Sequence, residues 1–201
     1  MPMPHLIVRT SVPSEFDTVL PVCVEAFADE TVSAWVEPDP ERRRQRTREL
    51  LEQSLREAVD AGQLLVAFLT GGGPVAASVW TELPGIPPEF ELPDDDRPVS
   101  ALAGRLAVVR SATGARHPDV PHVYLSAMAA LPHRRGLGAG SALLRHGLEH
   151  ARDVGLPVYL EASTPRNRRL YARHGFRDHG EPIPLPDGGP VLQPMWREAR
   201  A

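Results

Sequence analysis

The chain of 201 residues contains no lysine, so all 22 of its basic residues are arginines, set against 26 acidic residues and a formal charge of −4 at pH 7. The phosphate-binding loop of ATPases and cofactors held as a Schiff base both need a lysine, and the absence excludes both classes. The arginines are scattered through a slightly acidic chain, which lacks the basic surface that nucleic acid requires. We therefore expect no nucleic-acid partner.

Cysteine is almost absent as well, because Cys23 is the only one. One cysteine cannot form an internal disulfide or a thiolate metal cluster, which suits a reducing cytoplasm. Cys23 also falls on the apolar stripe of a predicted helix, where a small core side chain is expected. His146 and His150 have the i, i+4 spacing of a metal pair, but no third ligand accompanies them, so we expect no metal.

Long hydrophobic runs are missing too. No apolar stretch approaches the ~18–20 residues of a membrane span. The N-terminal "MPMPHLIVRT" lacks the basic region and apolar core of a signal peptide. The length is that of one good-sized domain. We expect a single cytoplasmic domain over residues 1–201, without a membrane partner.

Hydrophobic periodicity and turn residues predict a mixed sheet with helices between its strands, α/β or α+β in class. The expected strands are residues 5–10, 63–70, 74–82, 122–131 and 157–163, with two final strands around the turn "PDGG". The expected helices are residues 14–29 with Ser14 as N-cap, 40–62, 98–109, 140–154 and 166–174. In the third helix, Val99, Leu102, Leu106 and Val109 are expected to face inward. The longest irregular stretch is "LPGIPPEFELPDDDRP", residues 83–98.

The junction "ALPHRRGLGAGSALL", residues 130–144, joins the end of a predicted strand to the start of a predicted helix. Its glycines bare backbone N–H groups beside a helix N-terminus, and Arg134 and Arg135 add positive charge. Both features favour a phosphate or pyrophosphate ligand. The alternative is a flexible loop that binds nothing.

A dinucleotide is a rival ligand for this junction. "GLGAGS" satisfies G-x-G-x-x-S, and Glu161 follows about 20 residues later at the end of the next strand, where a ribose-binding acid would stand. However, "LPHRR" separates the predicted strand from the first glycine, and only about one βαβ unit of chain remains. This remains the weaker reading.

The same residues resemble the GCN5-related N-acetyltransferases (GNAT). In "ALPHRRGLGAGSALL", Arg135, Gly138 and Gly140 fill the family motif Arg/Gln-x-x-Gly-x-Gly/Ala. Downstream, "NRRLYARHGF" resembles a second family motif, with Asn167 and Tyr171. Within the family, "VAASVWT" and "LEASTPRNRRLYARHGF" are similar to puromycin N-acetyltransferases.

The resemblance implies a mixed, mostly antiparallel sheet that splays at the cofactor-binding strand, with helices on both faces. It implies acetyl-CoA as co-substrate, without a metal. Backbone groups of Met128, Ala129 and Ala130 would hold the pantetheine and the thioester carbonyl. The remaining implied cofactor residues are Arg134, Arg135, Gly136, Leu137, Gly138, Ala139, Gly140, Ser141 and Asn167.

The resemblance also implies that Tyr171 protonates the departing thiolate. Asn167 lies one helical turn before Tyr171, so both side chains can share a helix face. Glu161 alternates with Tyr159 and Ser163 on one face of its strand, and it is the candidate base for the amine. The alternatives are a packed tyrosine and a structural acid.

Further candidates concern the acceptor amine. Asp29, Glu30 and Glu82 could act on it, Trp80 and Trp35 could form an apolar wall, and Tyr124 and Ser126 could point into the acceptor cleft. The acids Asp94, Asp95 and Asp96 would attract a cationic small molecule.

The sequence thus predicts an acetyl-CoA-dependent N-acetyltransferase that acetylates a primary amine of a small molecule by direct attack in a ternary complex. A non-catalytic acyl-CoA-binding or regulatory domain is the alternative of another class. The sequence does not identify the acceptor amine. A homodimer is possible, but the sequence does not determine the oligomeric state.

Overall fold

The computed structural model describes residues 5–85 and 101–199. The strands are β1 (Leu6–Thr10), β2 (Leu64–Leu69), β3 (Pro74–Leu83), β4 (His122–Ala130), β5 (Val158–Ala162), β6 (Arg177–Asp178), β7 (Ile183–Pro184) and β8 (Val191–Arg197). The helices are α1 (Phe16–Ala28), α2 (Thr31–Val36), α3 (Pro40–Asp60), α4 (Ala101–Gly114), α5 (Ala139–Asp153) and α6 (Pro165–Arg173). The strands run in the order β1-β2-β3-β4-β5-β8-β6, with β7 beside β8. This is the mixed, mostly antiparallel sheet that the sequence predicts.

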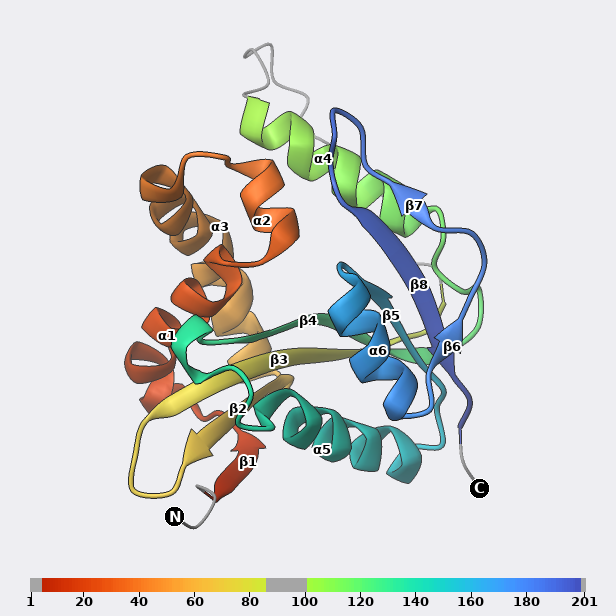
Figure 1. The fold of residues 1–201 in the computed structure, drawn as a ribbon. Coiled ribbons are helices and arrows are strands. Elements are labelled where there is room, and N and C mark those ends of the chain that lie inside the picture. The colour runs from red at the N-terminus through yellow and green to blue at the C-terminus, as the bar shows by residue number, and fades with distance from the viewer. Residues whose placement is uncertain (1–4, 86–100, 200–201) are drawn as a thin grey trace.

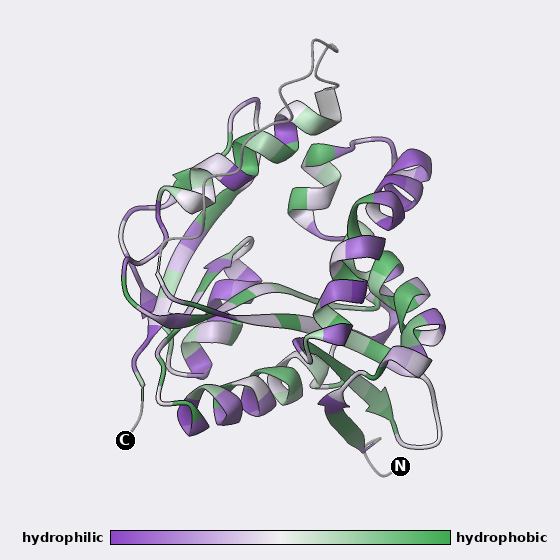
Figure 2. Cartoon of the chain, turned by 180° about the vertical axis from the view of Figure 1, so that it is seen from behind, coloured by the Kyte–Doolittle hydropathy of each residue, from purple (hydrophilic) through white to green (hydrophobic). Residues whose placement is uncertain are grey.

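Helices cover both faces of the sheet (Figure 1). On one face, α1 and α3 pack over a core that includes Phe16, Leu20 and Cys23. On the other face, α5 packs over β1 to β4 through Leu143 and Leu144, both fully buried. Figure 2 shows the hydrophobic side of α5 turned to the sheet and its hydrophilic side turned outward. Burial of Cys23 confirms its predicted core position.

Several element boundaries differ from the sequence prediction. Ser14 does not cap α1, because a 3-10 turn over Pro13–Glu15 precedes the helix. The short helix α2 was not predicted at all. The helix expected over residues 98–109 runs to Gly114, and its first three residues and the side chain of Leu102 lie outside the described part. In contrast, α3 begins at residue 40 as expected, and Asp39 caps it by accepting a hydrogen bond from the backbone N–H of Glu41 at 2.9 Å.

A third, smaller core joins α2 and α4 to the C-terminal strands. It centres on Ile183, Leu185 and Leu192. The ring of Trp35 packs against it, and Arg105 on α4 donates a hydrogen bond to the backbone oxygen of Trp35 at 2.7 Å. This contact places α2 and α4 side by side above the middle of the sheet (Figure 1).

The sheet opens between β4 and β5. These parallel strands pair only at Val123 with Val158 and at Tyr124 with Tyr159. Beyond that point β4 continues along β3, whereas β5 continues along β8. The register of β3 against β4 also shifts, so that Ser126 is an extra residue in β4. Such a bulge bends a strand and redirects its side chains. The result is a splay at the centre of the sheet, as the family resemblance implied.

No helix among the described residues is both long enough and apolar enough to cross a membrane.

Candidate active site

The glycine-rich junction forms the floor of a cavity of about 500 Å³. A short 3-10 turn, Pro132–Arg134, follows β4, and Gly138 then serves as the N-cap of α5. Gly136 and Gly138 have φ angles of +88° and +84°, a region that is strained for any residue with a side chain. An added Cβ at either glycine would meet nothing within 4 Å, so the backbone is open to the cavity side.

The structure brings together eleven of the twelve residues expected to bind the cofactor. They line this first cavity as Met128, Ala129, Ala130, Arg134, Arg135, Gly136, Gly138, Ala139, Gly140, Ser141 and Asn167. Leu137 is the exception, because it does not line the cavity and is half-buried in the turn.

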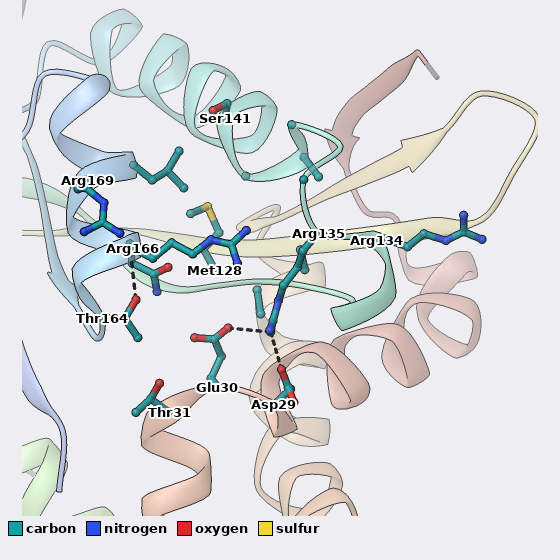
Figure 3. A pocket seen from close by; sticks show the side chains of 18 of the residues that line it. Asp29, Glu30, Thr31, Met128, Arg134, Arg135, Ser141, Thr164, Arg166 and Arg169 are labelled. Carbon is teal, nitrogen blue, oxygen red and sulfur yellow. Dashed lines mark hydrogen bonds and ion pairs between the residues drawn. The ribbon is translucent and has the colours of Figure 1, made fainter. Parts of the chain in front are cut away.

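Sequence reasoning missed three arginines of this cavity. Arg166, Arg169 and Arg173 on α6 join Arg134 and Arg135 in its wall. Figure 3 shows Arg166 reaching from α6 toward the middle of the cavity. Their i, i+3, i+7 spacing on a short helix is the signal that could have identified them. Five arginines against two acids make the lining strongly positive, which suits a ligand with several phosphates.

The side chain of Arg135 turns away from the glycine loop (Figure 3). It lies 2.7 Å from a carboxylate oxygen of Asp29 and 3.7 Å from one of Glu30. These two acids follow α1, so the ion pairs tie the end of α1 to the loop before α5. Burial raises the pKa of the Glu30 carboxyl, and the charge of Arg135 opposes that shift.

A second cavity, of about 530 Å³, lies between the splayed sheet and helices α2, α3 and α4. Its walls are mainly apolar, with Leu51 and Leu55 from α3 and Leu106 and Val109 from α4. The two inward residues of α4 thus face this cavity, as their spacing predicted. Glu30, Met128 and Asn167 line both cavities, so the two spaces meet beside the open edge of β4.

The two expected catalytic residues both line the second cavity, with Tyr124, Ser126 and Asn167. Asn167 and Tyr171 therefore share a face of α6 as predicted, and Tyr171 lies in its last turn. The side-chain amide of Asn167 donates a hydrogen bond to the Ser163 hydroxyl at 3.2 Å. Burial, together with the negative charges of Glu30 and Glu161, raises the pKa of Tyr171 well above its usual value. Its hydroxyl is therefore protonated at neutral pH.

Glu161 has a closely defined environment. Its side chain is 7% exposed, and the Tyr124 hydroxyl donates a hydrogen bond to Oε2 at 2.9 Å. Burial raises the pKa of the Glu161 carboxyl to about 7, against the pull of its tyrosine neighbours. A carboxyl with this pKa can accept a proton at neutral pH and release it again.

Three of the residues predicted to contact the acceptor amine, Trp80, Trp35 and Glu82, lie outside both cavities. Trp80 is wrong as an acceptor wall, because its indole packs over α5 in the core and would overlap a Cβ at Gly147. Trp35 belongs to the third core and lines neither cavity. Glu82 also lines neither cavity and pairs with His150 at 3.0 Å.

The pairing with Glu82 involves His150, one of the two histidines with i, i+4 spacing. In the described ranges no group of three metal-ligating side chains occurs. The acids Asp94, Asp95 and Asp96 lie outside the described residues.

The dinucleotide reading requires a doubly wound parallel sheet. Here β4, α5 and β5 form one βαβ unit, and the other neighbour of each strand is antiparallel. The acid that this reading assigns to a ribose is instead buried in the splay. The fold does not support this alternative.

Comparison with known proteins decides the family, because a model described as the acetyltransferase (GNAT) family matches residues 25–176. The chain belongs to this family. Membership makes it an N-acetyltransferase whose donor is acetyl-CoA.

Solved structures of GNAT proteins share the fold. A Corynebacterium glutamicum protein described as histone acetyltransferase HPA2 and related acetyltransferase is 28% identical, with a TM-score of 0.71 over 99% of this chain and 98% of that one. Arylalkylamine N-acetyltransferase 2 of Aedes aegypti is 15% identical, with a TM-score of 0.72 over 98% and 100%. The PaiA N-acetyltransferase of Thermoplasma acidophilum, in complex with coenzyme A, is 12% identical, with a TM-score of 0.60 over 96% and 99%.

Proposed function

We propose that this GNAT enzyme acetylates a primary amine of a small molecule by direct attack in a ternary complex, as a single domain over residues 1–201. The observation that carries the proposal is the meeting of a positively charged cavity and an apolar cavity at Met128 and Asn167, with Glu161 and Tyr171 on the apolar side. This arrangement fits a donor with phosphates in one space and an amine with an apolar body in the other.

The first cavity suits acetyl-CoA. The N–H groups of residues 136 to 141 and the positive end of α5 would hold the pyrophosphate, and the arginines of α6 would neutralise further phosphate charge. The thioester would then reach the open edge of β4. Leu131 donates its backbone N–H to Val75 on β3 at 2.9 Å. Because a strand alternates, the N–H groups of Ala130 and Met128 point the other way, toward the thioester.

The chemistry follows from the residues at the junction. The amine nitrogen attacks the thioester carbonyl carbon, a C–N bond forms, and the charge on the carbonyl oxygen is stabilised by the open backbone N–H groups of β4. Glu161 takes the proton that the amine loses. The C–S bond then breaks, and Tyr171 gives its proton to the thiolate of CoA.

Two features favour direct transfer over a covalent acetyl-enzyme. Cys23, the only cysteine, is fully buried in the core, and burial raises the pKa of its thiol to about 12. A thiol in that state is inert as a nucleophile at neutral pH. The second cavity also opens onto the same edge of β4 as the first, which allows the amine to meet the thioester without an intermediary.

The acceptor class rests on the second cavity. Its leucines and valines favour an apolar body. Glu30, where the two cavities meet, and Glu161 favour an amine on that side, and Arg43, Arg46 and Arg110 belong to other parts of the wall, on α3 and α4. Arylalkylamines, the substrates named for the Aedes aegypti relative, have this combination. We therefore place amines with an aromatic or branched apolar body first among the acceptors to be tried.

Two assays test the proposal in turn. The melting temperature is measured with acetyl-CoA, CoA and NAD, and CoA thiol release is then followed across a panel of apolar and polar primary amines. We expect stabilisation by acetyl-CoA and CoA but not by NAD, and amine-dependent thiol release. Acetyl-CoA binding without thiol release from any amine would favour the non-catalytic alternative. Stabilisation by NAD alone would contradict the proposal outright.

A further inference from the structure

A cluster of buried side chains stands behind Glu161. His117, in the loop between α4 and β4, has its Nε2 3.8 Å from Oε1 of Glu161, and its side chain is 2% exposed. The His117 ring contacts the rings of Tyr124 and Tyr159, with centroids 4.5 Å and 4.8 Å apart. His117 lines neither of the two cavities. It therefore approaches Glu161 from outside these two cavities.

This cluster also gathers polar atoms without hydrogen bonds. Two of its buried ring nitrogens, His117 Nδ1 and His122 Nε2, have no hydrogen-bond partner among the described residues. Buried polar groups are nearly always hydrogen-bonded, and each exception calls for an explanation. Two unpaired ring nitrogens beside one buried carboxyl make this cluster a candidate for a role in the reaction.

The two histidines of the cluster differ. His122 has a backbone partner, because its Nδ1 lies 2.8 Å from the oxygen of Val120. Among the described residues no backbone group anchors the His117 ring, and Glu161 is the ionisable side chain that its Nε2 approaches. An apolar side chain would fill the same space at lower cost if packing were the only requirement. The position of His117 is therefore best explained by an interaction of its ring with the Glu161 carboxyl.

We propose that His117 is a positioning residue for Glu161. Its neutral imidazole directs the Nε2–H at Oε1, while the Tyr124 hydroxyl donates to Oε2. The two donors fix the orientation of the carboxylate and favour its ionised form, which is the form that acts as a base. The separation of 3.8 Å is longer than a hydrogen bond. Contacts of this kind are often long without substrate and shorten when charge develops. The inference rests on the proposed function only in treating Glu161 as the base.

The ionisation states fit this role. Burial, with the neighbouring His122, lowers the pKa of His117 to about 4, so the imidazole is neutral at neutral pH. A neutral imidazole carries one N–H, and a donor facing a carboxylate lowers the pKa of that carboxyl. The other titratable groups in this environment are Tyr124, Tyr159 and Tyr171, and each is protonated because burial raises its pKa. Arg116 lies close enough to oppose that shift at Tyr159, and Glu30 lines the same cavity.

The test compares His117→Phe, which keeps the ring shape without a donor, with His117→Gln, which keeps a donor. The pH profile of kcat is measured at saturating acetyl-CoA, and the Glu161 carboxyl is titrated by ¹³C NMR. We expect His117→Phe to move both the acidic limb and the Glu161 titration upward by about one pH unit, which is a tenfold loss of rate below the limb. His117→Gln should stay within a few tenths of a unit of the wild-type enzyme.

Leu144→Ala, on the buried face of α5, is the control for lost stability alone, and its acidic limb should not move. An unchanged limb and an unchanged Glu161 titration in His117→Phe would overturn the proposal. Should that variant fail to fold, ¹⁵N NMR of the wild-type imidazole decides. An Nε2–H tautomer that stays neutral to about pH 5 is expected, and an Nδ1–H tautomer or protonation near the usual histidine pKa of about 6.5 overturns it.

The NMR titration also separates this inference from the proposed function. If no amine is acetylated, the proposed function fails. The pKa of Glu161 in the two variants still shows whether His117 interacts with this carboxyl.

Discussion

At the scale of single residues, the ionisation of Glu161 links activity to stability. Its pKa is about 7 in the folded protein, against an ordinary value of 4.5. Between these two pH values the unfolded chain loses the proton while the folded protein keeps it. The contribution of Glu161 to the free energy of unfolding is therefore greatest at low pH, and it falls by up to about 3 kcal/mol as pH rises from about 4.5 to about 7.

Glu161→Gln removes this loss, because an amide does not ionise. We expect the variant to unfold at a higher temperature than the wild-type protein at pH 8, with the difference shrinking toward pH 5. Its kcat should fall by about 10²-fold or more, since the proposed base is gone. Calorimetry at the two pH values checks the first expectation, and thiol release checks the second. A variant that is less stable at both pH values would mean that the carboxylate is held favourably in the fold.

Tyr171→Phe isolates the proposed proton donor, because the ring remains and only the hydroxyl is lost. The ring packs edge-on against Phe176, with centroids 5.9 Å apart, so the fold should be retained. We expect kcat to fall by about 10²-fold with the affinity for acetyl-CoA nearly unchanged. Steady-state kinetics and calorimetric titration measure the two quantities. Full turnover in this variant, where chemistry limits the rate, would show that Tyr171 is only a packing residue.

At the scale of elements, the two ends of α5 offer a matched pair of glycines. Gly138 precedes the helix at φ +84°, and Gly155 follows it at φ +70°, and an added Cβ at either would meet nothing within 4 Å. Aspartate at either position carries a similar left-handed strain of about 1–2 kcal/mol. Gly138→Asp also puts a negative charge where the pyrophosphate is expected.

We therefore predict that Gly138→Asp abolishes the rise in melting temperature that acetyl-CoA gives, whereas Gly155→Asp keeps it. Ligand at ~100 times its dissociation constant stabilises a protein by about 2.7 kcal/mol, which a thermal shift resolves easily. Equal shifts in the two variants would place the cofactor away from this loop.

The elements also show where sequence reasoning works and where it stops. Glycine and arginine spacing located the loop before α5, which lines the first cavity, because a short segment encodes both an open backbone and local charge. In contrast, α2 has only six residues, and contact between Trp35 and the C-terminal strands holds it. Such a helix depends on partners far along the chain, and no local pattern reveals it.

At the scale of the whole molecule, the mixed sheet that strand periodicity predicts is confirmed, and so is the splay that the family resemblance implied. The environment of Glu161 was only partly predictable. Its strand face was evident from alternation, but the approach of His117 joins residues from distant parts of the chain. Trp80 was misassigned for a related reason: the pattern of a strand gives alternation, and only the position of α5 decides which face is the core.

The two cavities that meet at Met128 and Asn167 carry the central claim, which is direct transfer from thioester to amine. Initial rates measured over a matrix of acetyl-CoA and amine concentrations test it most directly. If both substrates occupy their cavities at once, the double-reciprocal lines intersect, and no CoA is released before the amine is added. Parallel lines, with a burst of CoA from acetyl-CoA alone, would show a covalent acetyl-enzyme and contradict the account.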